Sequence, residues 1–403
     1  MKSIARDSLI TIAAYFFTAL FNYGFSVVMG WLLEPEAFGR LSVALTLYML
    51  GATLLVSGFP WVVARELARV QADREKKRIF KSALIGNTIF GLVLAALLQI
   101  ACLVGWLPLG REYAALIAVV AMGLMLMGPQ AVWRNALRGF FRLDAFGAAQ
   151  VLEASSGLAI GAIGALLGFG AVGAVFGQTG SILVTLCFTA FLLRRFRFWE
   201  ARGWASVETY TAGVFFFLGT ASITYLMHLD VLGVKFFTLA DADRQAGFFQ
   251  VAVTLARPPA FIALAIANAV FPHLARVAHN PIEARRTLAK VLQWSLLGLL
   301  PLHLGLALLA PQLIGLLYPP EFAPAGGMLR ILALCTMPLD VLFLLVAALQ
   351  AFGEVRLPAL TLLVALGMEW AGMHLLIPLT GPIGAGIALG VAAGTATLAL
   401  GVV

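Results

Sequence analysis

Long apolar segments alternate with short polar segments along the whole chain. Each apolar segment holds roughly 20 mostly hydrophobic residues, the length at which a helix crosses a bilayer. The segments are 9–33, 41–64, 83–105, 114–133, 147–168, 171–193, 210–235, 247–271, 291–310, 329–351, 357–378 and 381–403. None of them alternates like a barrel strand, and a lone strand cannot satisfy its backbone in lipid. The pattern therefore predicts an all-α polytopic membrane protein with twelve transmembrane helices.

The composition supports this interpretation and excludes several classes of protein. Of 403 residues, 62% are hydrophobic and 11% are charged, whereas soluble domains carry about 25% charged residues. The net charge of +8 does not indicate nucleic-acid binding, because Lys and Arg gather in the cytoplasmic loops of membrane proteins. The three cysteines lie in apolar segments and are expected to pack there, without disulfides or a metal. The first apolar segment is too long for a signal peptide and is expected to be a retained span.

The basic residues predict the orientation. Only five of the 27 Lys and Arg residues fall on the side opposite the amino terminus, and Arg257 lies inside a span; the five are Arg40, Arg111, Lys235, Arg244 and Arg330. This bias predicts a cytoplasmic amino terminus, and twelve spans then return the carboxy terminus to the same side. The loop 65–81 and the linker 194–209 carry many of these cations. We expect both to act mainly in topology, with aromatic anchors at the interface.

Three short matches indicate that the chain contains one unit twice. Gly39 aligns with Gly247 at an offset of 208, and Leu67-Ala68-Arg69 aligns with Leu274-Ala275-Arg276 at 207. Gly170-Ala171-Val172-Gly173-Ala174 aligns with Gly381-Pro382-Ile383-Gly384-Ala385 at 211. Six spans per copy is an even number, so the copies are parallel repeats. We expect two six-helix lobes, 1–205 and 206–403, with a substrate path between them, an arrangement typical of transporters.

Arg257 is the most informative polar residue inside a span. Pro258 and Pro259 follow it, so span eight is expected to bend or open at this point. Arginine offers a planar cationic fork that matches phosphate or carboxylate. Two interpretations remain open, an anion site and a structural ion pair with Asp230 of span seven, and both can hold in different states of a transport cycle.

Other polar residues at membrane depth also mark candidate sites. Asp340 and Glu369 lie near the middle of neighbouring spans, where desolvated carboxyl groups can carry a proton or a cation. The alternative is that both are hydrogen-bonded to backbone beside a proline kink. The first half is poorer in such residues and offers Asn22 in span one and Glu153 in span five. The histidines show no ligand spacing that indicates a metal.

Several ordered motifs resemble one branch of a known superfamily. Asp230 lies late in span seven, and the other motifs are Leu33-Glu34-Pro35-Glu36-Ala37-Phe38-Gly39, Ala246-Gly247-Phe248-Phe249, Phe271-Pro272, Leu317-Tyr318-Pro319-Pro320-Glu321-Phe322 and Leu329-Arg330-Ile331-Leu332. In this order they resemble the oligosaccharide flippases of the multidrug/oligosaccharidyl-lipid/polysaccharide exporter (MOP) superfamily. These are bacterial proteins that turn lipid-linked sugars across the inner membrane.

The resemblance implies a function and roles for the site residues. It implies two six-helix lobes around a central cavity, in a flippase for a polyprenyl-pyrophosphate-linked oligosaccharide that works by alternating access, with no cofactor. Arg257, the position that matches a cavity arginine of similar flippases, and more weakly Arg65 would meet the pyrophosphate, and Asn22 would line the cavity. Asp230, Asp340 and Glu369 would serve gating or coupling to H⁺ or Na⁺. The implied partners are the bilayer, the lipid-linked substrate and a glycan polymerase or glycosyltransferase.

Four other functions are compatible with parts of the sequence pattern. A multidrug/cation antiporter of the same fold would depend on the acidic residues more than on Arg257. A major facilitator transporter also has two parallel halves, but loop 65–81 lacks that family's glycine–aspartate pattern. A membrane glycosyltransferase or polymerase needs a sizeable soluble loop with paired carboxylates, so we expect no enzyme. A scaffold within a polysaccharide export complex is the fourth alternative.

Overall fold

The structure, a computed structural model, describes residues 2–206 and 214–402 of the chain. The chain divides into two compact units. Unit 1 contains Met1–Leu33 and Ala44–Phe217, and unit 2 contains Glu34–Val43 and Leu218–Val403. The boundary predicted between residues 205 and 206 lies beside the undescribed segment 207–213, so its position stays a prediction.

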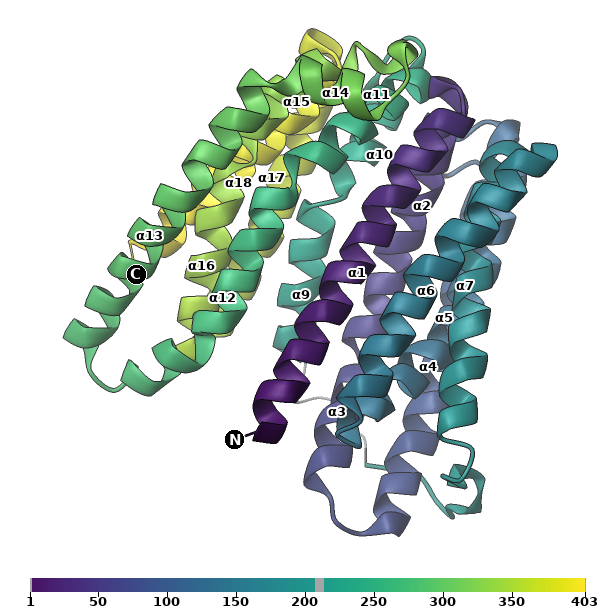
Figure 1. Cartoon of the computed structure of the whole chain (residues 1–403), viewed down its shortest axis with the longest axis vertical. Coiled ribbons are helices and arrows are strands. Elements are labelled where there is room, and N and C mark those ends of the chain that lie inside the picture. Colours follow the sequence, from purple (N-terminus) through teal and green to yellow (C-terminus); the bar gives the residue numbers. More distant parts are fainter. Residues whose placement is uncertain (1, 207–213, 403) are drawn as a thin grey trace. The chain divides into compact units, whose positions relative to one another are not determined.

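Helices form nearly all of the regular structure in the described residues (Figure 1). Unit 1 holds α1 (Lys2–Leu32), most of α2 (Pro35–Ser57), α3 (Phe59–Arg69), α4 (Asp73–Leu103), η1 (Arg111–Tyr113), α5 (Ala114–Gly139), α6 (Leu143–Gly164), η2 (Ala165–Phe169), α7 (Gly170–Leu192) and η3 (Phe198–Glu200).

Unit 2 holds the start of α2 and the remaining helices. They are most of α9 (Val214–Leu226), then α10 (Leu229–Phe237), α11 (Ala242–Ala256), α12 (Pro258–Val277), α13 (Pro281–Leu308), α14 (Ala310–Leu317), η4 (Pro320–Phe322), α15 (Ala325–Cys335), α16 (Met337–Ala351), α17 (Arg356–Thr380) and α18 (Ile383–Gly401).

The number of spans agrees with the sequence pattern. Ten helical stretches of the described chain are long and apolar enough to cross a membrane, and α9 with α10, bent by 47°, makes an eleventh. One of the ten, Leu143–Leu192, contains α6 and α7, which reverse at Gly168 (φ 90°) and Gly170 (φ 54°) and pack side by side. Twelve spans result, as predicted. Residues 210–213 and 403 of the predicted spans lie outside the described residues.

Several spans that the sequence pattern predicts as single helices are broken in the structure. The segment 41–64 divides at Gly58, ahead of Pro60, and 247–271 divides at Arg257, ahead of Pro258 and Pro259. The segment 329–351 divides at Thr336, ahead of Pro338. Proline lacks the amide donor that would continue the preceding helix, but it is tolerated in the first turn of a new helix, which explains the position of each break.

The internal repeat is visible in the packing. In unit 1, α6 packs on α7, α1 on α6 and α5 on α7; in unit 2, α17 packs on α18, α10 on α17 and α16 on α18. The aligned glycines Gly170 and Gly381 both have positive φ, 54° and 70°, at the turn before the last helix of each copy. Such a φ favours glycine because it has no Cβ. The duplicated sequence therefore specifies the same turn twice.

The aligned glycines Gly39 and Gly247 contact each other inside unit 2. A Cβ atom at Gly39 would lie 1.7 Å from the carbonyl oxygen of Asp243 and 2.9 Å from the amide nitrogen of Gly247. A Cβ atom at Gly247 would lie 2.2 Å from the carbonyl oxygen of Pro35. The starts of α2 and α11 thus cross backbone to backbone at equivalent positions of the two repeats.

Charged and aromatic side chains surround this crossing. Arg40 Nε donates to Asp243 Oδ2 at 3.2 Å, and Arg40 also pairs with Glu36 on the exposed side. Lys235 pairs with Asp243 from the end of α10. Phe38 packs edge-on against Phe322, with ring centroids 5.5 Å apart. These contacts explain why residues 34–43 belong to unit 2 although the rest of α2 belongs to unit 1.

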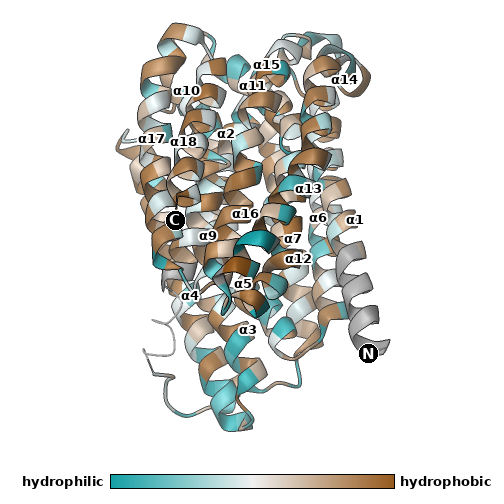
Figure 2. Ribbon diagram, turned by 90° about the vertical axis from the view of Figure 1, so that its left-hand side faces the viewer, coloured by the Kyte–Doolittle hydropathy of each residue, from teal (hydrophilic) through white to brown (hydrophobic). Residues whose placement is uncertain are grey.

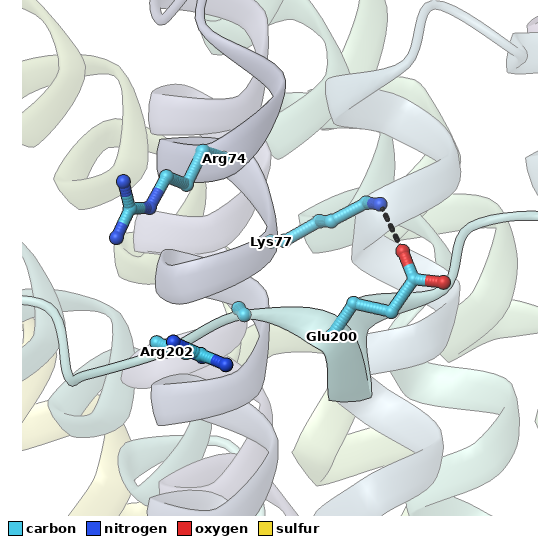
Figure 3. Close-up of a pocket in the computed structure, with 5 residues that line it drawn as sticks. Arg74, Lys77, Glu200 and Arg202 are labelled. Atoms are coloured by element: carbon cyan, nitrogen blue, oxygen red, sulfur yellow. Dashed lines mark hydrogen bonds and ion pairs between the residues drawn. The ribbon is translucent and has the colours of Figure 1, made fainter.

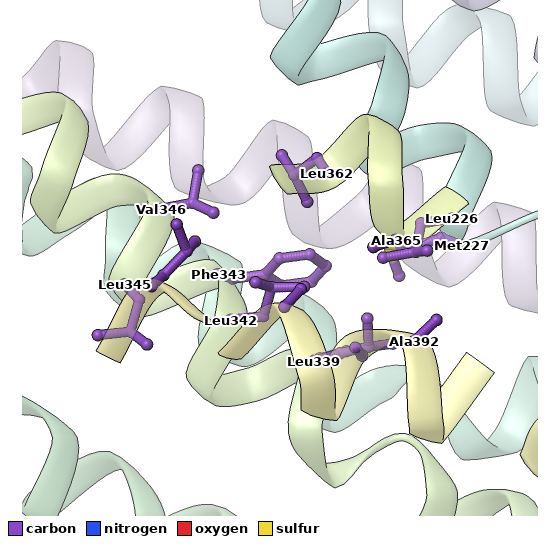
Figure 4. Packing of buried hydrophobic residues seen from close by; sticks show 14 of the residues in the cluster. Leu226, Met227, Leu339, Leu342, Phe343, Leu345, Val346, Leu362, Ala365 and Ala392 are labelled. Carbon is purple, nitrogen blue, oxygen red and sulfur yellow. The ribbon is translucent and has the colours of Figure 1, made fainter. Parts of the chain in front are cut away.

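Each unit has its own apolar core, and hydrophobic residues run along the helices of both (Figure 2). The core of unit 2 gathers around Leu339, Leu342 and Phe343 of α16 and includes Leu226, Leu362 and Ala392 (Figure 4). In unit 1 a core cluster gathers around Val63, Phe80 and Val132, where α3, α4 and α5 meet. These cores hold the polar side chains described below in fixed positions.

We predict that Gly39→Ala destabilises the protein by about 1–3 kcal/mol, because overpacking a close contact costs this much. Gly247→Ala should behave alike. The control is Gly298→Ala, since nothing lies within 4 Å of a Cβ at that position. The melting temperature of the purified protein, followed by size-exclusion fluorescence, measures the effect. Equal melting temperatures for Gly39→Ala and Gly298→Ala would contradict the close crossing.

Candidate functional site

The break between α11 and α12 positions Arg257. Its amide donates to the Val253 carbonyl at 3.2 Å, so it ends α11, and its own carbonyl accepts from the Phe261 amide at 3.2 Å at the start of α12. The first amides of a helix have no carbonyl acceptor within that helix. Pro258 and Pro259 follow Arg257 at the start of α12 and have no amide hydrogen, so they lose no hydrogen bond there. Arg257 is 5% exposed. The predicted interruption of span eight is present, and it holds a cation inside unit 2.

Asp230 is the partner of Arg257. It lies in the first turn of α10, just after the bend at His228. Arg257 Nη2 donates to Asp230 Oδ1 at 2.9 Å and to Oδ2 at 2.7 Å, and the Val231 amide donates to Oδ1 at 2.9 Å. The structural ion pair that the sequence left open is therefore formed in this structure. An additional role as an anion site stays a prediction.

The ion pair engages only part of the Arg257 guanidinium. Nη2 makes both contacts with Asp230, and within the described residues no hydrogen bond involves Nη1 or Nε. Guanidinium has five N–H donors in a planar fork. Three of them therefore remain for a further acceptor.

Glu369 of α17 lies in the same group of charges. It is fully buried, and neither carboxyl oxygen has a hydrogen-bond partner in the described part of the chain. The charges of Asp230 and Arg257 act on it. A buried carboxyl group without a partner needs a proton, a cation or a mobile donor to offset its desolvation. Arg257, Asp230 and Glu369 together form what we call the buried charge cluster of unit 2.

Asp340 lies in a different group, with His303 of α13. His303 Nε2 and Asp340 Oδ2 are 2.8 Å apart, and His303 Nδ1 faces the Ala333 carbonyl at 2.5 Å. A carbonyl only accepts, so Nδ1 carries a hydrogen, and one further proton is shared between Nε2 and the carboxyl group. The sequence placed Asp340 and Glu369 together as candidate ion carriers. In the structure Asp340 pairs with His303, whereas Glu369 lies with Asp230 and Arg257.

The two remaining predicted residues belong to unit 1. Arg65 of α3 is paired with Glu66 at 2.8 Å and lies over the Trp61 ring, 5.5 Å from its centroid. Its side chain is 37% exposed. Asn22 is an exposed residue of α1. Both belong to unit 1, whereas the buried charge cluster belongs to unit 2, and their predicted roles toward a cavity and a pyrophosphate stay predictions.

The sequence did not predict a polar cluster inside unit 1. Arg134 Nη1 donates to Glu153 Oε2 at 2.7 Å, and Gln130 Nε2 donates to the same oxygen at 2.8 Å. In the sequence, Arg134 comes directly after the predicted span 114–133, so the pattern places it outside the membrane. The spacing of Gln130 and Arg134, one helical turn apart on α5, places them on one face. This signal, together with the acidic residue in the next span, could have indicated the pair.

No group of three or more His, Cys, Asp or Glu residues in the described ranges could hold a metal ion. The buried charge cluster remains a candidate functional site, because charged side chains are rare at membrane depth.

The comparisons with known proteins agree with the fold. An inward-facing multidrug resistance MATE family transporter of the MOP superfamily is similar, with TM-score 0.81 and 18% identity over 97% of this chain and 96% of that chain. The lipid II flippase MurJ, in an inward closed conformation, is similar with TM-score 0.77 and 14% identity over 97% and 86% of the two chains. These likenesses show the fold; the two proteins are named as a transporter and a flippase.

No curated protein matches the chain. A sequence model of the polysaccharide biosynthesis protein family matches residues 4–278, which is more than half of the chain. The resemblance to the flippases of the MOP superfamily is thereby confirmed. The chain is a multi-span membrane protein that belongs to the polysaccharide biosynthesis protein family.

Proposed function

We propose that this protein is a flippase that moves a polyprenyl-pyrophosphate-linked oligosaccharide across the inner membrane of a bacterium, with both termini in the cytoplasm. The observation that carries the proposal is Arg257, a buried arginine at a helix break within a span, in a chain of this family. The bilayer and the lipid-linked substrate are its partners. A glycan polymerase or glycosyltransferase is a further candidate partner.

The donors left on Arg257 suit the pyrophosphate. A phosphate group binds a guanidinium best through two parallel N–H bonds, and Nη1 and Nε are the donors that Asp230 does not use. An anion that approaches these donors adds negative charge beside Asp230 and Glu369. The added repulsion weakens the hold of Asp230 on Arg257, so substrate binding competes with the ion pair.

This competition supports coupling to an ion. A carboxylate released from Arg257 at membrane depth needs a proton or Na⁺ to offset its charge. Glu369 is a second acceptor in the same cluster. In the proposed cycle, the protein binds the pyrophosphate with Asp230 and Glu369 neutralised, alternates its access, and re-forms the Arg257–Asp230 pair when the substrate leaves. The Asp340–His303 pair, with its shared proton, is a second candidate for coupling.

A multidrug/cation antiporter is the second candidate function. Glu369, which is buried and has no hydrogen-bond partner among the described residues, favours it, because a cationic drug would neutralise that carboxyl group. The two functions differ in which residue meets the substrate. Efflux of a cationic dye that depends on Glu369 but not on Arg257 would identify the antiporter.

We predict that Arg257→Ala lowers the rate of lipid-linked oligosaccharide flipping at least about tenfold, because the paired phosphate contacts are lost. Arg257→Lys should keep part of the rate, since lysine retains the charge without the fork. The measurement is flipping in proteoliposomes, with Arg195→Ala, which changes an exposed arginine of unit 1, as the control.

Arg257→Ala also leaves Asp230 unpaired, and breaking a buried pair costs about 3–5 kcal/mol. The double variant Asp230→Ala/Arg257→Ala removes both charges and should recover stability. It should still fail to flip substrate. Flipping at the normal rate by a stable double variant would refute the role of Arg257 in binding the anion.

We predict that Glu369→Gln removes the dependence of transport on the pH or Na⁺ gradient and leaves the melting temperature unchanged or higher. The amide keeps the size of the side chain and removes a buried group that ionises without a partner. Transport is measured with imposed gradients, and Glu354→Gln, at an exposed position, is the control. An unaltered gradient dependence in Glu369→Gln would exclude Glu369 as the coupling residue.

A further inference from the structure

The linker segment, residues 196–206, folds onto the start of α4 in unit 1. Phe196 and Phe198 place their rings against Phe80, with centroids 5.5 and 5.1 Å away. Phe198 also packs on Trp133 at 5.6 Å. The linker segment is thus anchored to the apolar core of unit 1, although only its short turn η3 is helical.

Polar contacts fix the rest of the linker segment. Lys81 Nζ donates to the Ala201 carbonyl at 3.0 Å, and the Ala205 amide donates to Ser82 Oγ at 2.9 Å. Lys81 also lies over the Trp204 ring, 5.5 Å from its centroid. These contacts hold residues 200–205 beside the first three turns of α4, so the cations of both segments share one surface.

A pocket of about 430 Å³ opens between the two segments. Arg74, Lys77, Glu200, Ala201 and Arg202 line it (Figure 3). Its volume is within the range of small-ligand pockets, about 300–1,000 Å³. Three of the five lining residues are cationic and one is acidic, so the pocket carries net positive charge.

The acidic residue of the pocket is already paired. Lys77 Nζ donates to Glu200 Oε2 at 2.9 Å, and Arg197 Nη1 lies 3.4 Å from Glu200 Oε1. The hydrogen bond from Lys77 lowers the pKa of the Glu200 carboxyl group, so this group is ionised at neutral pH. In Figure 3 the Lys77 side chain points to Glu200, whereas the Arg74 side chain points away from that pair.

Arg74 and Arg202 are the cations that remain. Both are exposed, and neither has a hydrogen bond or an ion pair with any described residue. Two guanidinium groups that line one pocket offer N–H donors in a planar arrangement that matches the oxygens of a phosphate group. We propose that Arg74 and Arg202 form a binding site for a phosphoryl anion, which is either the headgroup of an anionic phospholipid or a free phosphate or pyrophosphate.

The place of the site along α4 is compatible with both sources. A helix of 31 residues is about 46 Å long, whereas the hydrocarbon core is about 30 Å thick. Roughly ten residues of α4 therefore extend beyond the hydrocarbon core. Arg74 and Lys77 lie in the polar first two turns, before the apolar run that begins at Ala83. Trp199 and Trp204, 60% and 58% exposed, add rings suited to the lipid interface.

The test compares two variants that lose the same charge. Arg74→Gln/Arg202→Gln removes the two pocket arginines. Arg69→Gln/Arg195→Gln removes two exposed arginines of unit 1 that line no part of this pocket. In one arm, each protein in zwitterionic nanodiscs is titrated with inorganic pyrophosphate. In the other arm, native mass spectrometry measures how much phosphatidylglycerol stays bound to each protein, compared with phosphatidylcholine.

We expect the pocket variant to bind one of the two probes about tenfold more weakly than the wild type and the Arg69/Arg195 control, because charge-assisted contacts are lost. The arm that responds identifies the source of the phosphate. Arg74→Lys/Arg202→Lys should recover part of the binding. The site would be overturned if the pocket variant and the Arg69/Arg195 control bound both probes equally well. It would also be overturned if the two variants lost binding to the same extent. Repeating the comparison in Asp230→Ala/Arg257→Ala removes any contribution of the buried arginine and separates this result from the proposed transport function.

Discussion

The pairing of Arg257 with Asp230 is the interaction on which the arrangement of unit 2 depends. A charge buried in a span without a partner costs several kcal/mol, so the two side chains must meet. Two helix breaks bring them together. The bend at His228 places Asp230 at the first turn of α10, where the Val231 amide also donates to it. The prolines after Arg257 open the other helix. The charges of both residues act on Glu369, and the cluster contains more acid than base.

The two copies of the repeat share backbone geometry but not chemistry. The glycine pairs Gly39/Gly247 and Gly170/Gly381 recur because each copy needs the same close crossing or the same positive φ, and only glycine provides it without strain. At the offset of 208, by contrast, Asp230 aligns with Asn22 and Arg257 with Met49. Unit 1 has a partly buried ion pair of its own, Arg134 with Glu153, on other helices of the repeat. Duplication thus preserved the scaffold, and each copy acquired its charges separately.

The sequence predicted the features that depend on the length of the hydrophobic segments and on the positions of prolines. The twelve spans follow from the thickness of the bilayer, and the break at Arg257 follows from the two prolines behind it. The sequence did not predict which polar residues pair, because pairing depends on the rotation of each helix about its axis. Apolar residues surround these helices on all sides, so hydropathy does not fix that rotation. For this reason Asp340 was grouped with Glu369, whereas the packing of α13 against α16 gives it His303.

The linker segment shows how one set of cations can serve two purposes. The rule that positive charges stay in the cytoplasm counts Lys and Arg residues and is indifferent to their partners. Folding then assigns a partner to some of them: Lys77 and Arg197 contact Glu200, Arg142 donates to the Leu192 carbonyl, and Lys81 donates to Ala201. Arg74 and Arg202 receive none within the described chain. A topological role therefore accounts for the presence of these arginines, but not for the folded pocket that leaves two of them facing an open space. Anion binding accounts for that pocket and is compatible with the topological role.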